Sequence, residues 1–169
     1  VNRAGTVATL LPDTAGRLIV GGEFRRVGAT TAANLARLNA NGTADPTFDV
    51  GSGPAGAVKR IVRLADGKLA VLGGFSTFSG VARSVIVRLQ ANGALDLSFQ
   101  FPGIPAYPED VAPASGGKVL LLGSFLLDPS PSQKPLLRLN SDGSIDATFN
   151  AGAAGDMERA LGVAAQPDG

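Results

Sequence analysis

The sequence lacks cysteine, histidine and tryptophan, and it has one methionine and one tyrosine among its 169 residues. Without thiols or imidazoles, the chain can form no disulfide, no Cys/His zinc site, no cysteine nucleophile and no Ser-His-Asp triad of its own. Any catalysis would have to use carboxylates, hydroxyls, lysine or arginine. We therefore expect a protein that is not an enzyme and that needs no metal or other cofactor.

A strong charge of either sign is also missing, because 15 basic and 14 acidic residues leave a net charge of +1. Such a chain has no net field to attract nucleic acid or an anionic membrane. Charged residues make up 17% and apolar ones 44%, which is too apolar for a disordered chain. The longest apolar stretch, Val119 to Leu127, is about half as long as a spanning helix. We expect a folded protein with no nucleic-acid partner and no membrane span.

Glycine and proline are abundant, at 23 and 11 residues, which favours turns and short strands over long helices. Three segments align without a gap, Gly16 to Phe48, Gly67 to Phe99 and Gly117 to Phe149, and their starts lie 51 and 50 residues apart. Eight columns are identical in all three, namely Gly16/Gly67/Gly117, Gly22/Gly73/Gly123, Phe24/Phe75/Phe125, Arg37/Arg88/Arg138, Leu38/Leu89/Leu139, Gly42/Gly93/Gly143, Asp45/Asp96/Asp146 and Phe48/Phe99/Phe149. The sequence therefore predicts three repeat units, at about 7–50, 57–101 and 108–150, and the start of a fourth at 157–169.

Each unit is predicted to contain four short strands. The first strands are expected at Val7 to Leu11, at Val58 to Leu64, around Val111 and at Leu161 to Ala165. The second strands are continuously apolar, as in a sheet covered on both faces, at Leu18 to Val20, Leu69 to Leu72 and Val119 to Leu122. The third strands, Leu35 to Leu38, Ile86 to Leu89 and Leu136 to Leu139, lead to Asn-Gly or Asp-Gly pairs. Such pairs favour a tight hairpin turn, so a fourth strand is expected to carry Asp45, Phe48 and their equivalents.

A meander of four antiparallel strands that recurs about every fifty residues is typical of a β-propeller blade. The predicted fold class is thus all-β, with three four-stranded antiparallel blades plus an extra strand. Closed propellers have roughly 4 to 8 blades, so three units predict an incomplete ring. Two interpretations remain open, a fragment of a larger propeller and a subunit of a ring or filament that is completed between chains.

Two motifs carry a family resemblance. The patterns G-[RK]-[LV]-x-[VL]-x-G-x-F and R-L-[NQ]-x-[ND]-G-x-x-D-x-[TS]-F resemble the delta-60 repeat, a bacterial β-propeller repeat. Gln90 departs mildly from the asparagine at Asn39 and Asn140. The resemblance implies one blade per repeat, an extracellular or cell-surface bacterial parent protein and no established enzymatic activity.

The turn residues allow a second interpretation. Asn39, Asn41 and Asp45, with Gly42 between them, resemble the first half of a calcium loop, in which oxygen ligands alternate and glycine permits a bend. The downstream bidentate glutamate of such loops is missing. An Asn-Gly turn with local hydrogen bonds explains the same residues. We favour the turn and do not expect calcium binding.

Arginine and aspartate recur together in every unit, for example Arg37 with Asp45. This recurrence predicts an ion pair across the hairpin or between neighbouring blades. Arginine also binds carboxylates and phosphates well, so an anion site is the alternative. The fixed place of the pair in every unit favours an architectural role.

The connections between units and between second and third strands differ from copy to copy. They comprise Arg25 to Asn34, Ser76 to Ser84, Leu126 to Pro135, Asp49 to Ala57, Gln100 to Glu109 and Asn150 to Met157. Binding residues of rigid scaffolds usually lie on such loops, although these loops can equally be merely tolerant of change. The candidate ligand-binding residues on this loop face are Arg25, Arg26, Phe78, Phe101 and Tyr107.

These observations predict a non-catalytic structural or interaction module of an exported bacterial protein. Its partner is expected to be another protein or further copies of the same blades. The alternative is a carbohydrate-binding or carbohydrate-acting propeller that uses loop carboxylates, such as Glu109 with Asp110 or Asp156 with Glu158. The lack of tryptophan and the few loop aromatics weigh against the alternative.

Overall fold

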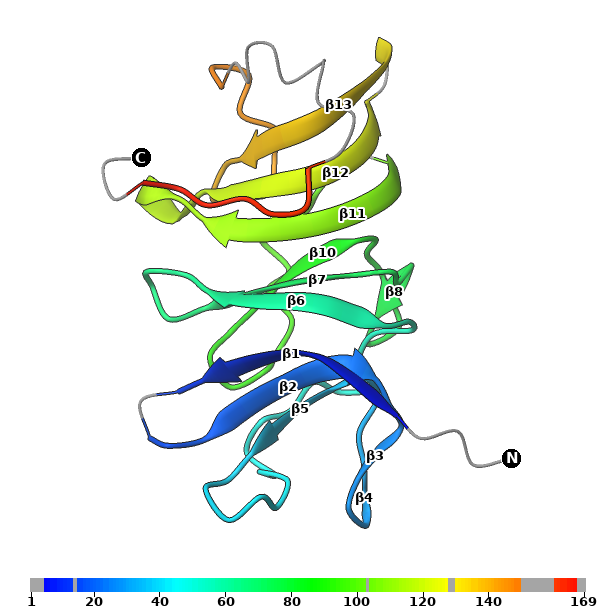
Figure 1. Ribbon diagram of the computed structural model, residues 1–169, viewed down its shortest axis with the longest axis vertical. Helices are drawn as coiled ribbons and strands as arrows, with labels where there is room; N and C mark the ends of the chain where they lie inside the picture. The colour runs from blue at the N-terminus through cyan, green and yellow to red at the C-terminus, as the bar shows by residue number, and fades with distance from the viewer. Residues whose placement is uncertain (1–4, 14, 103, 128–129, 150–159, 167–169) are drawn as a thin grey trace.

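The computed structural model of the chain describes residues 5–13, 15–102, 104–127, 130–149 and 160–166. This part of the chain is all β apart from one short 3-10 turn, Ser115–Gly117. Three antiparallel sheets of three strands lie one above another along the longest axis (Figure 1). Each sheet comes from one repeat unit, which confirms the all-β fold built from repeated blades. None of the described residues form a helix with the length and apolarity needed to cross a membrane.

The second strand is central in every sheet. The first unit has the order β1 (Thr6–Pro12), β2 (Leu18–Glu23) and β5 (Leu35–Leu38). The second unit has β6 (Val58–Arg63), β7 (Leu69–Gly73) and β10 (Ile86–Leu89), and the third has β11 (Ile104–Pro113), β12 (Val119–Leu127) and β13 (Ser130–Leu139). All five residues of β7 are buried, which explains why the second strands are continuously apolar.

The fourth strand that the sequence predicts is reduced to a single β-bridge in each unit. The bridges join Leu38 to Ala44, Leu89 to Leu95 and Leu139 to Ile145. After the bridge the chain turns, because the Asp45 carboxylate accepts a hydrogen bond from the Thr47 amide (2.9 Å) and the Asp45 carbonyl accepts one from the Phe48 amide (3.2 Å). The blades therefore have three strands and a bridge, and the expectation of four full strands is corrected.

The variable connections between second and third strands contain strands of their own in two units. The first has β3 (Arg26–Val27) paired with β4 (Thr30–Thr31), and the second has β8 (Thr77–Phe78) paired with β9 (Val81–Ala82). Gly28 and Gly80, with φ of 57° and 76°, supply the left-handed backbone that these tight turns require. In the third unit β12 and β13 are longer instead.

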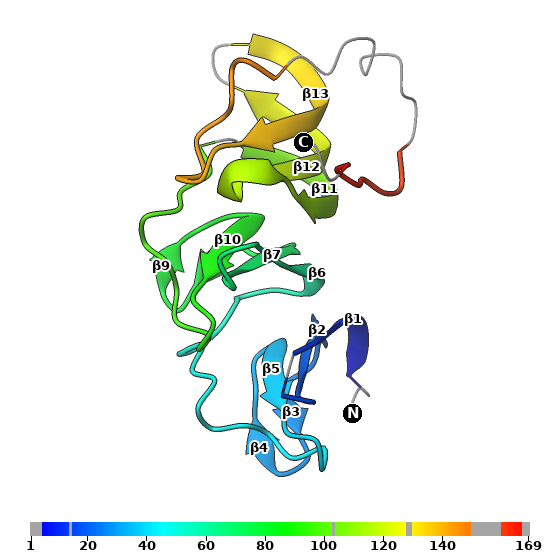
Figure 2. The same ribbon diagram turned by 90° about the vertical axis from the view of Figure 1, so that its left-hand side faces the viewer.

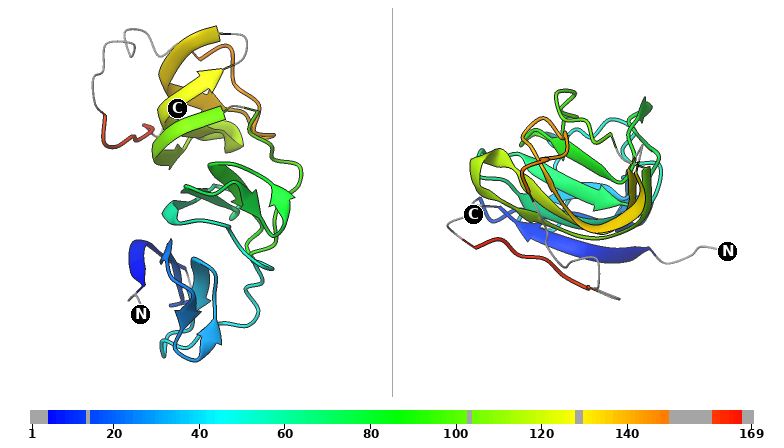
Figure 3. Two further views of the ribbon diagram at one scale, coloured as in Figure 1. Left: turned by 90° about the vertical axis from the view of Figure 1, so that its right-hand side faces the viewer. Right: turned by 90° about the horizontal axis from the view of Figure 1, so that it is seen from above.

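The two ends of the sheets have different roles. The short turns lie at the left end of every sheet in Figure 1, whereas β3, β8 and the starts of the first strands lie at the right end. The first strands β1, β6 and β11 lie along one side of the molecule, and the connections between units run along the opposite side (Figure 2). Seen from above, the three sheets largely overlie one another (Figure 3), so the described residues form an open stack and not a closed ring.

Apolar cores fill the two spaces between neighbouring units. Between the first and second units, Ile19, Leu35 and Phe48 pack in one cluster with Leu69 and Val71. Between the second and third units, the corresponding cluster is formed by residues such as Ala70, Ile86, Phe99, Val119, Leu121 and Leu139. These two clusters contain six repeated apolar residues of the motif, namely Phe48, Phe75, Phe99, Phe125, Leu89 and Leu139. Their role is thus structural.

Residues 160–166 lie beside β11 in an extended path but form no strand, unlike the expectation for Leu161 to Ala165 (Figure 1). The Val163 amide donates a hydrogen bond to Asp110 Oδ2 (3.0 Å). The equivalent Ile61 amide of β6 donates to Thr9 Oγ1 of β1 (3.3 Å). The segment therefore occupies the position of a fourth first strand, and no second strand among the described residues pairs with it. The connection Asn150 to Met157 lies outside the described residues.

Candidate functional site

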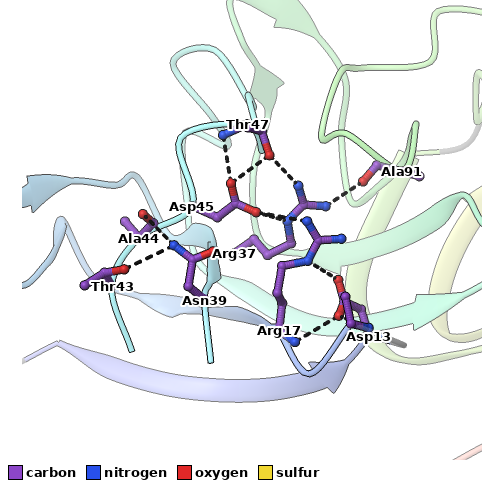
Figure 4. Close-up of polar contacts among 10 residues, drawn as sticks. Asp13, Arg17, Arg37, Asn39, Thr43, Ala44, Asp45, Thr47 and Ala91 are labelled. Atoms are coloured by element: carbon purple, nitrogen blue, oxygen red, sulfur yellow. Dashed lines mark hydrogen bonds and ion pairs between the residues drawn. The ribbon is translucent and has the colours of Figure 1, made fainter. Parts of the chain in front are cut away.

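A polar cluster follows the third strand of every unit, and Figure 4 shows the cluster of the first unit. In the first unit, Arg37 Nε donates a hydrogen bond to Asp45 Oδ2 (2.8 Å), and both side chains are more than nine-tenths buried. The Thr47 amide and hydroxyl both donate to Asp45 Oδ1, at 2.9 and 2.7 Å. The Arg37 guanidinium also lies over the Phe48 ring, 4.9 Å from its centroid. Four recurring positions of the motif are thus joined by direct contacts within one unit.

The same cluster recurs in the other two units. The Nε to Oδ2 distance is 2.8 Å for Arg88 with Asp96 and 2.8 Å for Arg138 with Asp146. The arginines lie 5.1 and 4.7 Å from the ring centroids of Phe99 and Phe149. The predicted ion pair across the hairpin is therefore confirmed in all three units.

A second cation joins each cluster, and the sequence analysis did not assign it. Arg17 Nη1, Lys68 Nζ and Lys118 Nζ lie 3.3, 3.0 and 2.7 Å from the Oδ2 atoms of Asp45, Asp96 and Asp146. These cations occupy the position after the first motif glycine, which is Arg or Lys in every unit. The recurrence of Arg or Lys at this position was the available signal in the sequence. The aspartate partner lies 28 residues away, and only the folded sheet brings the two side chains together.

The clusters also connect neighbouring units. Arg37 Nη1 donates to the Ala91 carbonyl of the second unit (3.1 Å), and Arg88 Nη1 donates to the equivalent Ser141 carbonyl of the third. The backbone adds a parallel bond, because the Asp49 amide donates to the Asn92 carbonyl (2.8 Å). The arginine pairs are architectural, and their guanidinium groups already have partners within the described chain.

The contacts of the aspartates lower their pKa values. Hydrogen bonds from the Thr47 hydroxyl and amide, with the Arg37 guanidinium, lower the pKa of Asp45 to about 2. Bonds from Lys118 and Thr148 hold the pKa of Asp146 well below its usual value. Burial acts to raise the pKa of Asp96, but bonds from Ser98, Lys68 and Arg88 outweigh it and lower the pKa. All three aspartates are ionised near neutral pH.

The turn interpretation of Asn39, Asn41 and Asp45 is confirmed by their hydrogen bonds. Asn41 Oδ1 accepts bonds from the Thr43 amide (3.1 Å) and hydroxyl (2.7 Å), and Asn39 Nδ2 donates to Thr43 Oγ1 (3.1 Å). Gly42 adopts a φ of 81°, as the tight turn requires. Within the described residues no group of three acidic side chains gathers as metal ligands would. Calcium at Asp45 would have to displace two cationic side chains.

A groove of about 400 Å³ opens where the first strands begin, at the loop end of the stack. All three units contribute to its lining, which consists of Thr6, Ala8, Gly22, Glu23, Ala57, Val58, Lys59, Gly74, Tyr107, Pro108 and Glu109. Most of this lining is apolar. In the groove the variable ends of all three units therefore face a shared space.

Charged and aromatic side chains border the groove. Lys59 Nζ pairs with Glu109 Oε2 (2.8 Å) and donates to the Pro108 carbonyl (2.6 Å). Both charged side chains are nearly half exposed. Tyr107 is 72% exposed, and it is the most exposed large apolar side chain of the described residues. An apolar floor with one exposed ring and one accessible ion pair suits a ligand that is partly apolar and partly polar.

Two of the residues predicted for ligand binding are buried, which corrects the sequence interpretation. Phe78 is fully buried and packs edge-to-face against Phe75, with ring centroids 6.2 Å apart. Phe101 is 8% exposed and packs in the same way against Phe125 at 5.9 Å. Loop position suggested exposure, but the connections fold back over the sheets and use these rings as core. We remove both residues from the candidate surface.

The remaining candidates do not form one site. Arg25 and Arg26 are exposed beside and within β3 of the first unit, where Arg26 Nη2 donates to the Ala29 carbonyl (2.9 Å). Tyr107 belongs to β11, and the second unit lies between them (Figure 1). Only Tyr107 lines the groove, together with Lys59 and Glu109, which the prediction did not include.

The loop carboxylates of the carbohydrate alternative are already paired where they are described. Glu109 contacts Lys59, whereas Asp110 Oδ1 lies 3.2 Å from Arg60 Nε and Asp110 Oδ2 accepts the Val163 amide. The second pair, Asp156 and Glu158, lies outside the described residues.

Comparison with protein families identifies the repeats. A family model described as "Domain of unknown function (DUF5122) beta-propeller" matches residues 16–48, 64–99 and 115–149. The three matched segments contain the three aligned segments of the sequence and leave the groove-lining starts of the first strands outside. In a comparison with curated proteins, none matches the chain.

Proposed function

The chain belongs to the DUF5122 β-propeller family, and from that premise we propose that it is a non-catalytic interaction module that binds a partner protein at the loop end of the stack. The observation that carries the proposal is the apolar groove under the exposed Tyr107, to which all three units contribute. The scaffold is uniform, whereas most positions that line the groove differ between units, Gly22 being an exception. Binding residues on rigid repeats usually follow this division.

The proposed ligand is an exposed segment of a protein with an apolar side chain flanked by polar groups. The apolar lining would bury that side chain, and Lys59 and Glu109 would pair with charges or amides beside it. We also propose that the units are delta-60 repeats and that the parent protein is bacterial and extracellular or bound at the cell surface. Their motif resemblance supports this setting.

Selection of linear peptides from a random displayed library against the full chain tests the proposal. We expect enriched peptides that contain an apolar residue and whose dissociation constants rise about tenfold with Tyr107→Ser, because the exposed ring is lost. Leu97→Ser is the matched control, since Leu97 is 65% exposed but does not line the groove. Fluorescence anisotropy measures both variants.

Two results would contradict the proposal. One is enrichment of peptides whose affinity is the same for wild type and Tyr107→Ser. The other is binding of oligosaccharides on a glycan array that Glu109→Gln abolishes, which would favour the carbohydrate alternative.

A further inference from the structure

Neighbouring units of the stack contact each other through two different surfaces. One outer face of the stack has the first of these surfaces, and the opposite outer face has the second. We define the leading face by Leu18, Leu38 and Gly42 of the first unit. We define the trailing face by Leu136, Arg138 and Phe149 of the third unit. In the second and third units, the side that corresponds to the leading face contacts the preceding unit. In the first and second units, the side that corresponds to the trailing face contacts the following unit.

Residues of the leading face are open, although their equivalents are covered. Leu18 and Leu38 are half-buried, whereas Leu69, Leu89, Val119 and Leu139 are 0% exposed at the same positions. Gly42 is exposed, and a Cβ added to it would meet nothing within 4 Å. A Cβ at Gly93 would lie 3.0 Å from the Asp49 carbonyl oxygen, and one at Gly143 would lie 2.7 Å from the Gln100 nitrogen.

The trailing face shows the same difference. Leu136 is half-buried, whereas Leu35 and Ile86 are each 1% exposed. The Arg138 side chain is 25% exposed, in contrast to 7% for both Arg37 and Arg88. Those two arginines each donate to a carbonyl in the turn of the following unit, and the described residues place no such turn beside Arg138.

We infer that the trailing face of one copy of the chain binds the leading face of a second copy, in the register that joins units within the chain. Arg138 would donate to the Ala40 carbonyl of the second copy, because Ala40 is equivalent to Ala91 and Ser141. Leu136 and Phe149 would pack on Leu18 and Leu38, as Ile86 and Phe99 pack beside Val119 and Leu139. This contact is independent of the groove.

A head-to-tail contact gives a closed ring when the rotation closes and an open filament when it does not. Two copies of the described stack together hold six units, which is within the roughly 4 to 8 blades of closed propellers. The assembly inferred for this chain is the closed one, a dimer with two identical contacts.

Residues 160–166 compete with this contact. They occupy beside β11 the position that β6 occupies beside β1, through the matching bonds of Val163 to Asp110 and Ile61 to Thr9. In the dimer, β1 of the second copy takes that position and the segment is displaced. The segment thus weakens association, and removal of its Val163 amide bond strengthens association.

Sedimentation velocity over a range of concentrations tests the inference with the full chain. We expect the mass to approach that of a dimer, with a dissociation constant lowered about tenfold in Val163→Pro, which lacks the amide proton. Val163→Ala retains that amide and is the control. Arg138→Ala raises the dissociation constant about tenfold or more in the Val163→Pro background, because a charged hydrogen bond is lost.

Gly42→Asn distinguishes this interface from any other. Asparagine tolerates a positive φ, and its side chain meets open space in the single chain but would collide with an incoming unit. We expect folded monomers. Gly67→Asn, at a φ of 82° in a turn with no neighbour within 4 Å, is the matched control and keeps the dimer. The inference is overturned if Val163→Pro remains monomeric at all concentrations, or if Gly42→Asn and Gly67→Asn associate equally.

Discussion

Individual arginines and aspartates join turns that belong to different units. Arg88 contacts Asp96, Ser98, the Phe99 ring and the Ser141 carbonyl, so one side chain connects its own hairpin to the next. Buried pairs of this kind add little net stability because desolvation offsets their attraction, but loss of one partner leaves a buried charge behind. The arginines therefore determine how units are oriented more than how strongly they attract.

Removal of a buried arginine should lower the free energy of unfolding more than removal of its more exposed equivalent. Arg88→Ala removes one of the two cations that pair with the buried Asp96 carboxylate and also the bond to the Ser141 carbonyl of the next unit, and it is expected to lower the free energy of unfolding by about 3 kcal/mol. Arg138→Ala should cost about 1 kcal/mol, because that side chain is already 25% exposed. Urea unfolding at protein concentrations that keep the chain monomeric measures both, and equal losses would contradict the role of Arg88 between units.

Stability should fall in acid through the motif aspartates. The pKa of Asp45 is lowered to about 2 in the folded chain, whereas an unfolded aspartate titrates near 4. Ionisation therefore stabilises the fold above about pH 5, and this contribution is lost as the pH falls through 4 toward 2. Urea midpoints between pH 7 and pH 2 measure the loss.

Two variants test whether Asp45 contributes to this pH dependence. Asp45→Asn should show a smaller decrease in stability between pH 5 and pH 2 than wild type, because it has one fewer group to protonate. Asp66→Asn, which changes a carboxylate that is about half exposed, should keep the wild-type profile. A wild-type profile in Asp45→Asn would be inconsistent with the pKa shift.

At the scale of elements, turns and central strands were predictable because their signals are local. The Asn-Gly and Asp-Gly pairs and the apolar runs at β2, β7 and β12 predict the hairpins directly. The fourth strand was not predictable in this way. Asp45 and Thr47 are compatible with a strand, but the carboxylate of Asp45 bonds to the amide two residues later and bends the chain.

Two short ribbons and the groove were also missed. The ribbons β3–β4 and β8–β9 have only two residues per strand, too few for an alternating pattern. Because β8 folds back over the sheet, it buries Phe78, which sequence position alone assigned to the surface. The groove likewise depends on three first strands that are about fifty residues apart in sequence.

Equivalent turn glycines should respond differently to substitution. Gly42→Ala and Gly93→Ala both strain a left-handed backbone, at φ of 81° and 94°, which costs about 1–2 kcal/mol. Gly93→Ala should cost about 1 kcal/mol more, because its Cβ would press on the Asp49 backbone of the first unit. Thermal or urea unfolding of the monomer measures the difference, and a larger loss for Gly42→Ala would contradict the packing between units.

Across the described residues the second unit has a complete neighbouring unit on both faces, whereas the first and third units each have one. The second unit shares an apolar cluster with the first unit and another with the third. Stability of a stacked repeat protein is close to a sum of unit and interface terms, so the middle unit gains from two interfaces.

Hydrogen exchange should therefore be slowest in the middle of the stack. We expect the amides of β7 and β10 to exchange more slowly than those of β2 and β12, because opening the second unit breaks both apolar clusters. Mass spectrometry of exchanged peptides resolves the three units. Slower exchange in either outer unit of the monomer would show that the interfaces do not govern stability.

The side chain seven residues before the first motif glycine differs in every unit and makes the units non-interchangeable. It is Thr9, Arg60 or Asp110, and Arg60 pairs with Asp110 across the second and third units. A designed tandem of second units would place arginine beside arginine, and a tandem of third units would place aspartate beside aspartate. The charges at this column thus favour the order of the second and third units, and an engineered propeller built from these repeats should avoid like charges at neighbouring positions of the column.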